Sequence, residues 1–165
     1  MRYLTLIACL CFSIAVSAQD IDKTLPSYEL STLDGKKVDV SSYAKKGKPV
    51  ILSFWTTWCK PCINELNAIA DYYEEWQEEY DVELVAISLD DQRTKNRVKP
   101  VVAMQQWDYE VLLDPNRESM RQFNFQSPPY LVMIDKEGKI VYQHSSYTPG
   151  SEAELEDVLI EITEK

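Results

Sequence analysis

The sequence contains few of the residues on which metal and nucleic-acid sites depend. Its 165 residues include one histidine, His144, and four cysteines, and acidic residues outnumber basic ones by 27 to 17. The resulting net charge of −10 disfavours binding to nucleic acid or to an anionic membrane surface, because both attract clusters of Lys and Arg. The chain also has no internal repeat, low-complexity tract or Gly/Ser-rich linker, so we expect a single folded domain.

The amino-terminus has the features of an export signal. Arg2 precedes an apolar stretch over residues 3–16, which is shorter than the ~20 residues that a membrane-spanning helix requires. The stretch ends in Val16-Ser17-Ala18, a sequence suited to signal-peptidase cleavage. We therefore predict a signal peptide over residues 1–18, cleaved after Ala18, and export to the periplasm. A lipobox-like segment ending in Cys9 makes a lipoprotein the less favoured alternative, because the apolar run before it is very short.

Cleavage leaves one mature domain, residues 19–165, with a single pair of cysteines. These are Cys59 and Cys62, separated by two residues. Paired cysteines in an exported protein normally form a structural disulfide. A bridge across two residues closes so short a loop, however, that it removes little entropy from the unfolded chain. We therefore favour a redox-active Cys59–Cys62 disulfide, and we expect no other cofactor.

The apolar pattern alternates between strands and helices. Residues 49–55 form a continuous apolar run typical of a buried central strand, and residues 61–80 have helical periodicity. The other predicted elements are a hairpin over 26–40, a strand over 82–89, a helix over 94–107, a strand over 109–113, a short helix over 118–123, a hairpin formed by 130–134 and 139–143, and a helix after Gly150. This order predicts a three-layer α/β domain with a central mixed sheet flanked by helices. In such sheets the site lies at the carboxyl end of a central strand, where Cys59 and Cys62 are found.

The local sequence assigns different roles to the two cysteines. A thiolate is the attacking species in disulfide exchange, so a redox cysteine needs surroundings that lower its pKa. A helix that begins at Lys60-Pro61 would direct unpaired amides at the Cys59 sulfur, and Lys60 adds a nearby cation. We therefore predict that Cys59 is the nucleophile and that Cys62, one turn into the helix, is the resolving thiol.

Glu65 lies three residues after Cys62 and hence on the same helix face. A partly buried carboxylate at this position could take a proton from Cys62 or return one. The alternative is that an acid in the first turns simply interacts well with the helix dipole. The spacing alone does not choose between these two interpretations.

The stretch Phe54-Trp55-Thr56-Thr57-Trp58-Cys59-Lys60-Pro61-Cys62, with Glu65 behind it and Pro129 before a strand that ends in Ile134-Asp135, resembles the thioredoxin superfamily. The similarity is closest to the exported TlpA/ResA-like thiol–disulfide oxidoreductases. It implies a thioredoxin-like fold with an extra N-terminal β-hairpin and a Cys-x-x-Cys that cycles between dithiol and disulfide. It also implies that Glu65 handles protons and that Pro129 is a cis-proline facing the disulfide.

The sequence departs from the thioredoxin pattern at three positions. Ser53 occupies the place of a buried acid, so proton handling depends more on Glu65, and Asn67 replaces a helix-kinking proline. Pro128 precedes the expected cis-proline and has no N–H, so an extended substrate should lose one main-chain hydrogen bond. We expect Trp55, Trp58 and Tyr130 to compensate as apolar walls. The complete set of expected substrate-binding residues is Trp55, Trp58, Lys60, Pro61, Pro128, Pro129 and Tyr130.

Three alternative functions have weaker support. Sco-type copper proteins use two cysteines and a histidine, but three residues separate their cysteines; we expect no metal site, and we expect His144 to lie after the last strand, away from the cysteines. A peroxiredoxin would have a suitably placed Thr56, but the proline expected four residues before it is Leu52. A non-catalytic peptide-binding module would not need both thiols.

Pro61 before the second cysteine resembles the reducing members of the superfamily, near ~−270 mV for thioredoxin, more than the oxidant DsbA, near ~−120 mV. We therefore expect a monomeric reductase of exported protein thiols and disulfides, with apocytochromes c among the candidate substrates. Because exported proteins fold in an oxidising compartment, such a reductase would need electrons from a membrane thiol donor.

Overall fold

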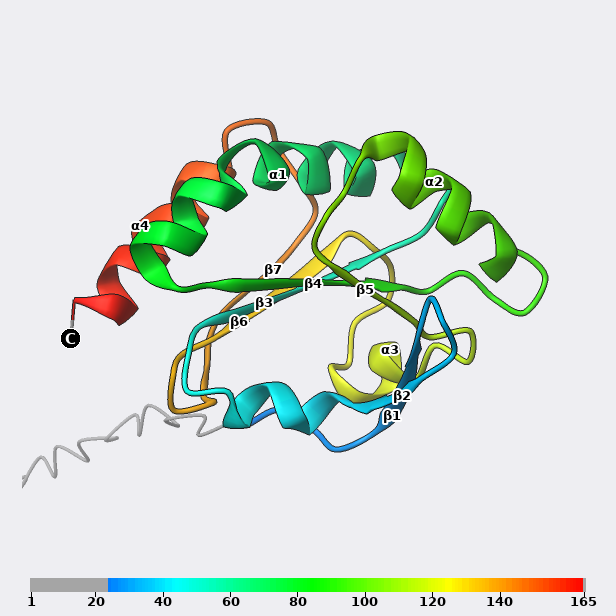
Figure 1. The fold of residues 1–165 in the computed structure, drawn as a ribbon, viewed down its shortest axis with the longest axis horizontal. Helices are drawn as coiled ribbons and strands as arrows, with labels where there is room; N and C mark the ends of the chain where they lie inside the picture. The colour runs from blue at the N-terminus through cyan, green and yellow to red at the C-terminus, as the bar shows by residue number, and fades with distance from the viewer. Residues whose placement is uncertain (1–23, 165) are drawn as a thin grey trace, which may run out of the picture.

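One mixed sheet forms the centre of the molecule. The structure, a computed structural model, describes residues 24–164. Seven strands pair in the order β2-β1-β5-β4-β3-β6-β7, and helices cover both faces of the sheet (Figure 1). The strands are β1 (Glu29–Thr32), β2 (Lys37–Asp39), β3 (Val50–Trp55), β4 (Glu83–Ser88), β5 (Glu110–Leu113), β6 (Tyr130–Ile134) and β7 (Ile140–Ser145). The helices are α1 (Lys60–Tyr80), α2 (Val98–Gln105), α3 (Glu118–Gln122) and α4 (Glu152–Thr163), with the short 3-10 helices η1 (Val40–Lys45) and η2 (Lys95–Arg97).

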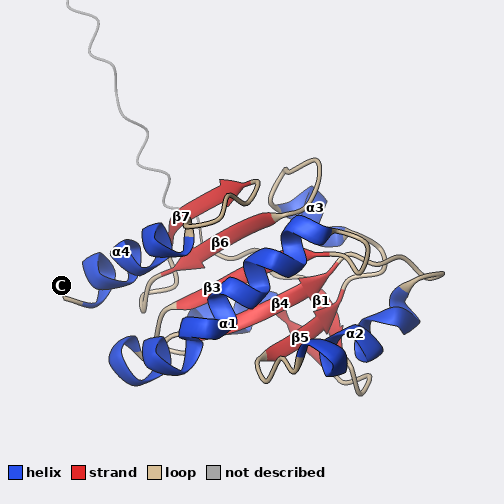
Figure 2. Cartoon of the chain, turned by 90° about the horizontal axis from the view of Figure 1, so that it is seen from above, coloured by secondary structure: helices blue, strands red, loops and turns tan. Residues whose placement is uncertain are grey.

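β3 is the central strand that leads to the cysteines. It runs parallel to β4 and antiparallel to β6, and all six of its residues are buried. A strand that is covered on both faces needs apolar side chains at nearly every position, which explains its VILSFW sequence. α1 leaves the carboxyl end of this strand and crosses back over the sheet (Figure 2).

The two faces of the sheet have separate apolar cores. Leu66 and Ile69 of α1 and Leu159 of α4 pack on one face. Val40 and Tyr43 of η1 pack on the other face, where α3 also lies. The three-layer α/β architecture with a mixed sheet is therefore confirmed, and β1 and β2 form the expected N-terminal hairpin.

The structure corrects the predicted elements in two places. The helix expected over 94–107 is instead η2 followed by the short α2, with Pro100 in the first turn of α2, where a missing N–H is tolerated. The last strand, β7, extends to Ser145, beyond the predicted end at Gln143, because it pairs with the whole of β6.

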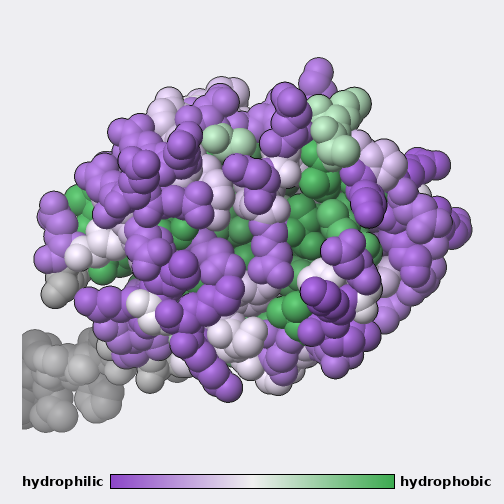
Figure 3. Space-filling view, viewed as in Figure 1, coloured by the Kyte–Doolittle hydropathy of each residue, from purple (hydrophilic) through white to green (hydrophobic). Residues whose placement is uncertain are grey.

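The predicted signal peptide and its cleavage after Ala18 lie outside the described residues, as does the alternative lipidation at Cys9. Within residues 24–164, no helix combines the length and apolar character needed to cross a membrane. Hydrophilic residues occupy most of the face seen in Figure 3, with hydrophobic surface gathered in the middle and toward α2.

Candidate active site

Cys59 lies at the junction between β3 and α1. It is the N-cap of α1, its backbone is extended (φ −87°, ψ 91°), and its Sγ accepts a hydrogen bond from the Cys62 amide at 3.3 Å. Pro61 lies within the first turn, where its missing N–H costs nothing. The helix therefore begins where the sequence predicts, and a donor that would stabilise a thiolate points at the first sulfur.

Cys59 and Cys62 are joined by a disulfide with an S–S distance of 2.00 Å and a Cα–Cα distance of 5.3 Å. Cys62 has no exposed surface, whereas Cys59 retains 6%. A reagent approaching from solvent can therefore reach the disulfide only at Cys59. This asymmetry fits the order of attack in disulfide exchange, in which the first cysteine meets the substrate.

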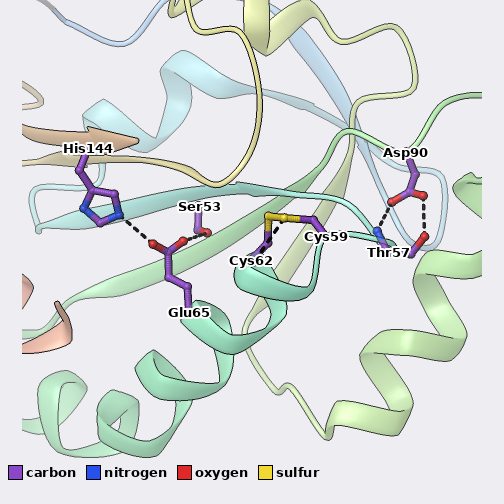
Figure 4. The surroundings of a disulfide bond; sticks show 7 residues. All are labelled: Ser53, Thr57, Cys59, Cys62, Glu65, Asp90 and His144. Atoms are coloured by element: carbon purple, nitrogen blue, oxygen red, sulfur yellow. Dashed lines mark hydrogen bonds and ion pairs between the residues drawn. A yellow bond between two sulfur atoms is a disulfide. The ribbon is translucent and has the colours of Figure 1, made fainter. Parts of the chain in front are cut away.

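A buried carboxylate fixes the loop that carries Cys59. Asp90 follows β4 and is 1% exposed. It accepts hydrogen bonds from the Thr57 amide at 2.7 Å, from the Thr57 hydroxyl at 2.7 Å and from the Ser88 hydroxyl at 3.0 Å. The Leu89 amide also donates to the Trp55 carbonyl at 2.8 Å. The carboxyl ends of β3 and β4 are thus tied together beside the disulfide (Figure 4).

Glu65 is buried behind the disulfide, one helical turn after Cys62. Its Oε2 accepts a hydrogen bond from the Ser53 hydroxyl at 3.3 Å, and its Oε1 lies 2.7 Å from Nε2 of His144. Figure 4 shows the Glu65 side chain directed toward Ser53 on β3 and His144 on β7. Glu65 therefore has polar partners on two strands, β3 and β7. An acid that only interacted with the helix dipole would not need these partners.

The structure contradicts the predicted position of His144. It lies within β7, not after the last strand, and its partner is Glu65 beside the cysteines. The longer β7 explains the difference, because pairing of Leu131 with His144 keeps this residue in the edge strand beside β6. His144 Nδ1 also lies 3.0 Å from the Tyr142 hydroxyl.

The peptide bond between Pro128 and Pro129 is cis, as the resemblance implies. Tyr130 pairs with Phe54, so Pro129 lies at the same end of the sheet as the loop to Cys59. Pro128 is half-buried and Pro129 is buried. Together with Tyr130 they help to line a cavity of about 320 Å³, whose other walls come from residues 124–127 and from Ser145 and Ser146.

The remaining predicted substrate-binding residues differ in their exposure. Trp58 is 63% exposed, and Lys60 and Pro61 are also exposed. Trp55 has no exposed surface, because its ring packs edge-on against Trp107 inside the core. Trp55 therefore cannot form a wall for substrate in this conformation, and that expectation is wrong.

A model of the AhpC/TSA family matches residues 21–143. The chain belongs to the AhpC/TSA family. It is 31% identical over 144 residues to the thiol-disulfide oxidoreductase ResA of Bacillus thuringiensis subsp. konkukian, an alignment that covers 87% of this chain and 79% of ResA. ResA of Bacillus anthracis is 33% identical over 123 residues, covering 74% of this chain and 68% of that protein. The solution structure of a thioredoxin-like protein from Porphyromonas gingivalis is similar with a TM-score of 0.76 and 42% identity, covering 85% of this chain and 92% of the other.

Within the AhpC/TSA family this chain is a TlpA/ResA-like member of the thioredoxin superfamily, as its motif predicts. Sequence reasoning nevertheless missed two features of the site. Asp90 could have been noticed, because it directly follows a buried parallel strand and the carboxyl ends of such strands meet at one edge. The contact between His144 and Glu65 gave no local signal, since 79 residues separate them.

Proposed function

We propose that this chain is a thiol–disulfide oxidoreductase that reduces disulfides in exported proteins. The observation that carries the proposal is the Cys59–Cys62 disulfide, placed at a helix N-terminus with only Cys59 reaching the surface. The curated relatives, which are named thiol-disulfide oxidoreductases, support the same reaction class. Exported proteins are the substrates expected from the predicted signal peptide.

The reaction proceeds by two exchanges of sulfur partners. The Cys59 thiolate attacks one sulfur of a substrate disulfide, forming a mixed disulfide and releasing the other substrate sulfur as a thiolate. The Cys62 thiolate then attacks Sγ of Cys59, which re-forms the intramolecular disulfide and expels the second substrate thiolate. Two electrons pass from the enzyme dithiol to the substrate. The oxidised enzyme must be reduced again before another cycle, and we infer that a membrane thiol donor does this.

The surroundings of Cys59 suggest how a polypeptide would bind. The exposed Trp58 ring precedes the reactive sulfur and offers an apolar contact. On the other side, an extended substrate would meet Pro128, which cannot donate a main-chain hydrogen bond. Specificity would therefore depend more on side-chain contacts than on strand-like pairing. Apocytochromes c, acting in cytochrome c maturation, are candidate substrates.

The proposal includes periplasmic location after cleavage at Ala18, and a monomeric enzyme. Both can be tested with the full-length protein: fractionation of cells that express it, with amino-terminal sequencing, would identify the compartment and the cleavage site. Recovery of an uncleaved cytoplasmic chain would refute export. Light scattering of the purified mature protein would test the monomer.

The activity itself is tested by reduction of insulin with dithiothreitol as electron donor. Free thiols should rise by two per chain on reduction, and the wild type should accelerate insulin reduction. Cys59→Ser should abolish the acceleration, whereas Trp58→Phe, which keeps a ring beside an intact disulfide, should retain most of it. Absence of acceleration by the wild type, together with peroxide consumption that depends on Cys59, would instead establish a thiol peroxidase. The reduction potential, measured against glutathione, should lie closer to that of thioredoxin than to that of DsbA.

A further inference from the structure

The proposed reaction requires the Cys62 thiol to transfer its proton to another group. Cys62 must lose a proton before its sulfur can attack Cys59, but Cys62 has no exposed surface. Water therefore cannot accept that proton directly in this conformation. The acid or base nearest along the helix face is Glu65, one turn later, and its side chain is only 2% exposed. A proton transferred to Glu65 is still enclosed by the protein.

The contacts of Glu65 define where the proton can go next. Within residues 24–164, its side chain hydrogen-bonds with Ser53 and His144. Ser53 is completely buried, whereas the His144 side chain is 15% exposed. Exposure therefore increases in order from Cys62 through Glu65 to His144. Of the two partners, only His144 combines contact with Glu65, access to solvent and two ring nitrogens that can each bind or release a proton.

The second ring nitrogen of His144 is also held in place. Nδ1 lies 3.0 Å from the Tyr142 hydroxyl. Burial raises the pKa of Tyr142 to about 12, and a hydrogen bond to Glu154 on α4 adds to the shift. Tyr142 therefore keeps its proton at any working pH and acts as a fixed support for the imidazole. Such a partner restricts the ring orientation and keeps Nε2 directed at Glu65.

The other ionisable groups around the pair come from β7, from α4 and from the segment between them. The Glu65 charge acts on Tyr142 and on Tyr147, whose pKa is raised by burial and by the charges of Glu152 and Glu65. Neither Lys nor Arg is among the groups that shift these two tyrosines. The His144 ring therefore lies between the Glu65 carboxylate and the Tyr142 hydroxyl, with one ring nitrogen facing each.

We infer that His144 is a positioning residue that carries the Cys62 proton from Glu65 to solvent during the resolving step. The Cys62 thiol gives its proton to the Glu65 carboxylate, and its electron pair forms the bond to Cys59 as the substrate thiolate leaves. Nε2 of His144 takes up the proton held by Glu65, and the ring then releases the proton on its other nitrogen, Nδ1, to water. No electron passes through the pair. This inference rests on the proposed function, because it assumes that Cys62 resolves a mixed disulfide.

Ellman's reagent separates the two exchanges in one experiment. Mixed with the reduced protein, it loses one thionitrobenzoate to attack by Cys59 and a second when Cys62 resolves the mixed disulfide. Stopped-flow absorbance from pH 5 to 9 should therefore show two phases. His144→Gln, which can still donate a hydrogen bond to Glu65 but cannot carry a proton, should slow the second phase about tenfold at pH 7. It should leave the first phase within about twofold and change the pH profile of the second phase only.

Three further variants make the test specific. Glu65→Gln should slow the second phase at least as much, and the double variant should be no slower than Glu65→Gln alone, because His144 acts through Glu65. Val141→Thr, at an exposed position of the same strand, is the matched control and should leave both phases unchanged. A wild-type rate and pH profile in His144→Gln would overturn the inference, as would equal slowing of both phases or additive effects in the double variant. Failure of the wild type to show a second phase, or to reduce insulin, would overturn the proposed function instead.

Discussion

Replacing Asp90 with alanine should lower the free energy of unfolding by about 3–5 kcal/mol, because three donors lose a charged acceptor at once. Those donors are the Thr57 amide, the Thr57 hydroxyl and the Ser88 hydroxyl, at 2.7, 2.7 and 3.0 Å. Each hydrogen bond to a charged group contributes about 1.5–3 kcal/mol. The sum is reduced here because Thr57 is only half-buried, so water can replace part of what is lost.

Comparison with Asp90→Asn separates the effect of the charge from that of the hydrogen bonds. An asparagine oxygen can accept from the Thr57 amide and from Ser88, while its amide can donate to the Thr57 hydroxyl, which rotates to accept. All three contacts then survive without the charge, and the expected loss is about 1–2 kcal/mol. Thr57→Val, which removes one hydroxyl and keeps the backbone donor, should cost a similar amount.

Urea unfolding of the oxidised proteins, followed by circular dichroism, measures all three variants under one set of conditions. The expected order of stability is wild type, then Asp90→Asn and Thr57→Val together, then Asp90→Ala. A loss below about 1 kcal/mol in Asp90→Ala would refute the idea that this carboxylate holds the active-site loop. Equal losses in Asp90→Ala and Asp90→Asn would show that charge matters and hydrogen-bond geometry does not.

Other consequences of the structure can be tested separately. Cys62→Ser should accumulate the mixed disulfide on Cys59, visible as a mass adduct that dithiothreitol removes; a variant that turns over normally would contradict the resolving role. Pro128→Thr restores a backbone N–H and should tighten binding of a trapped peptide several-fold by calorimetry, so unchanged or weaker binding would count against the proposed groove. Hydrogen bonds from Arg93 lower the pKa of Asp91 from 3.8 to about 2. The stability that Asp91 contributes should thus be complete above pH 4 and disappear toward pH 2, and Asp91→Asn should remove this part of the acid-unfolding curve.

The central part of the fold could be predicted because its determinants are local. The apolar run of β3 and the helical period of α1 each specify one element from neighbouring residues, and Pro61 marks where the helix begins. The same locality explains why Cys59 and Cys62 were correctly placed at the carboxyl end of a central strand. The positions that failed depend on contacts between distant segments. Trp55 was predicted to bind substrate because it lies just before the Cys-x-x-Cys motif. It is the last residue of β3, and its side chain points into the core.

The polar part of the site depends on tertiary structure. Glu65 could be assigned to the Cys62 face of α1 from spacing alone, whereas its partners come from β3 and from β7. The position of His144 was wrong because the predicted strand ended at Gln143, two residues before the end of β7 at Ser145. A shift of two residues in the end of a strand is within the ordinary uncertainty of sequence patterns. Here it decided whether the one histidine belonged to the site.

The exposure of Trp58 gives the protein an intrinsic optical reporter. Trp55, Trp76 and Trp107 are at most 7% exposed, whereas Trp58 is 63% exposed and directly precedes Cys59. A soluble quencher such as acrylamide would therefore reach one indole of the four. A polypeptide docked over the disulfide would shield that indole, so tryptophan emission can follow docking in real time without a label.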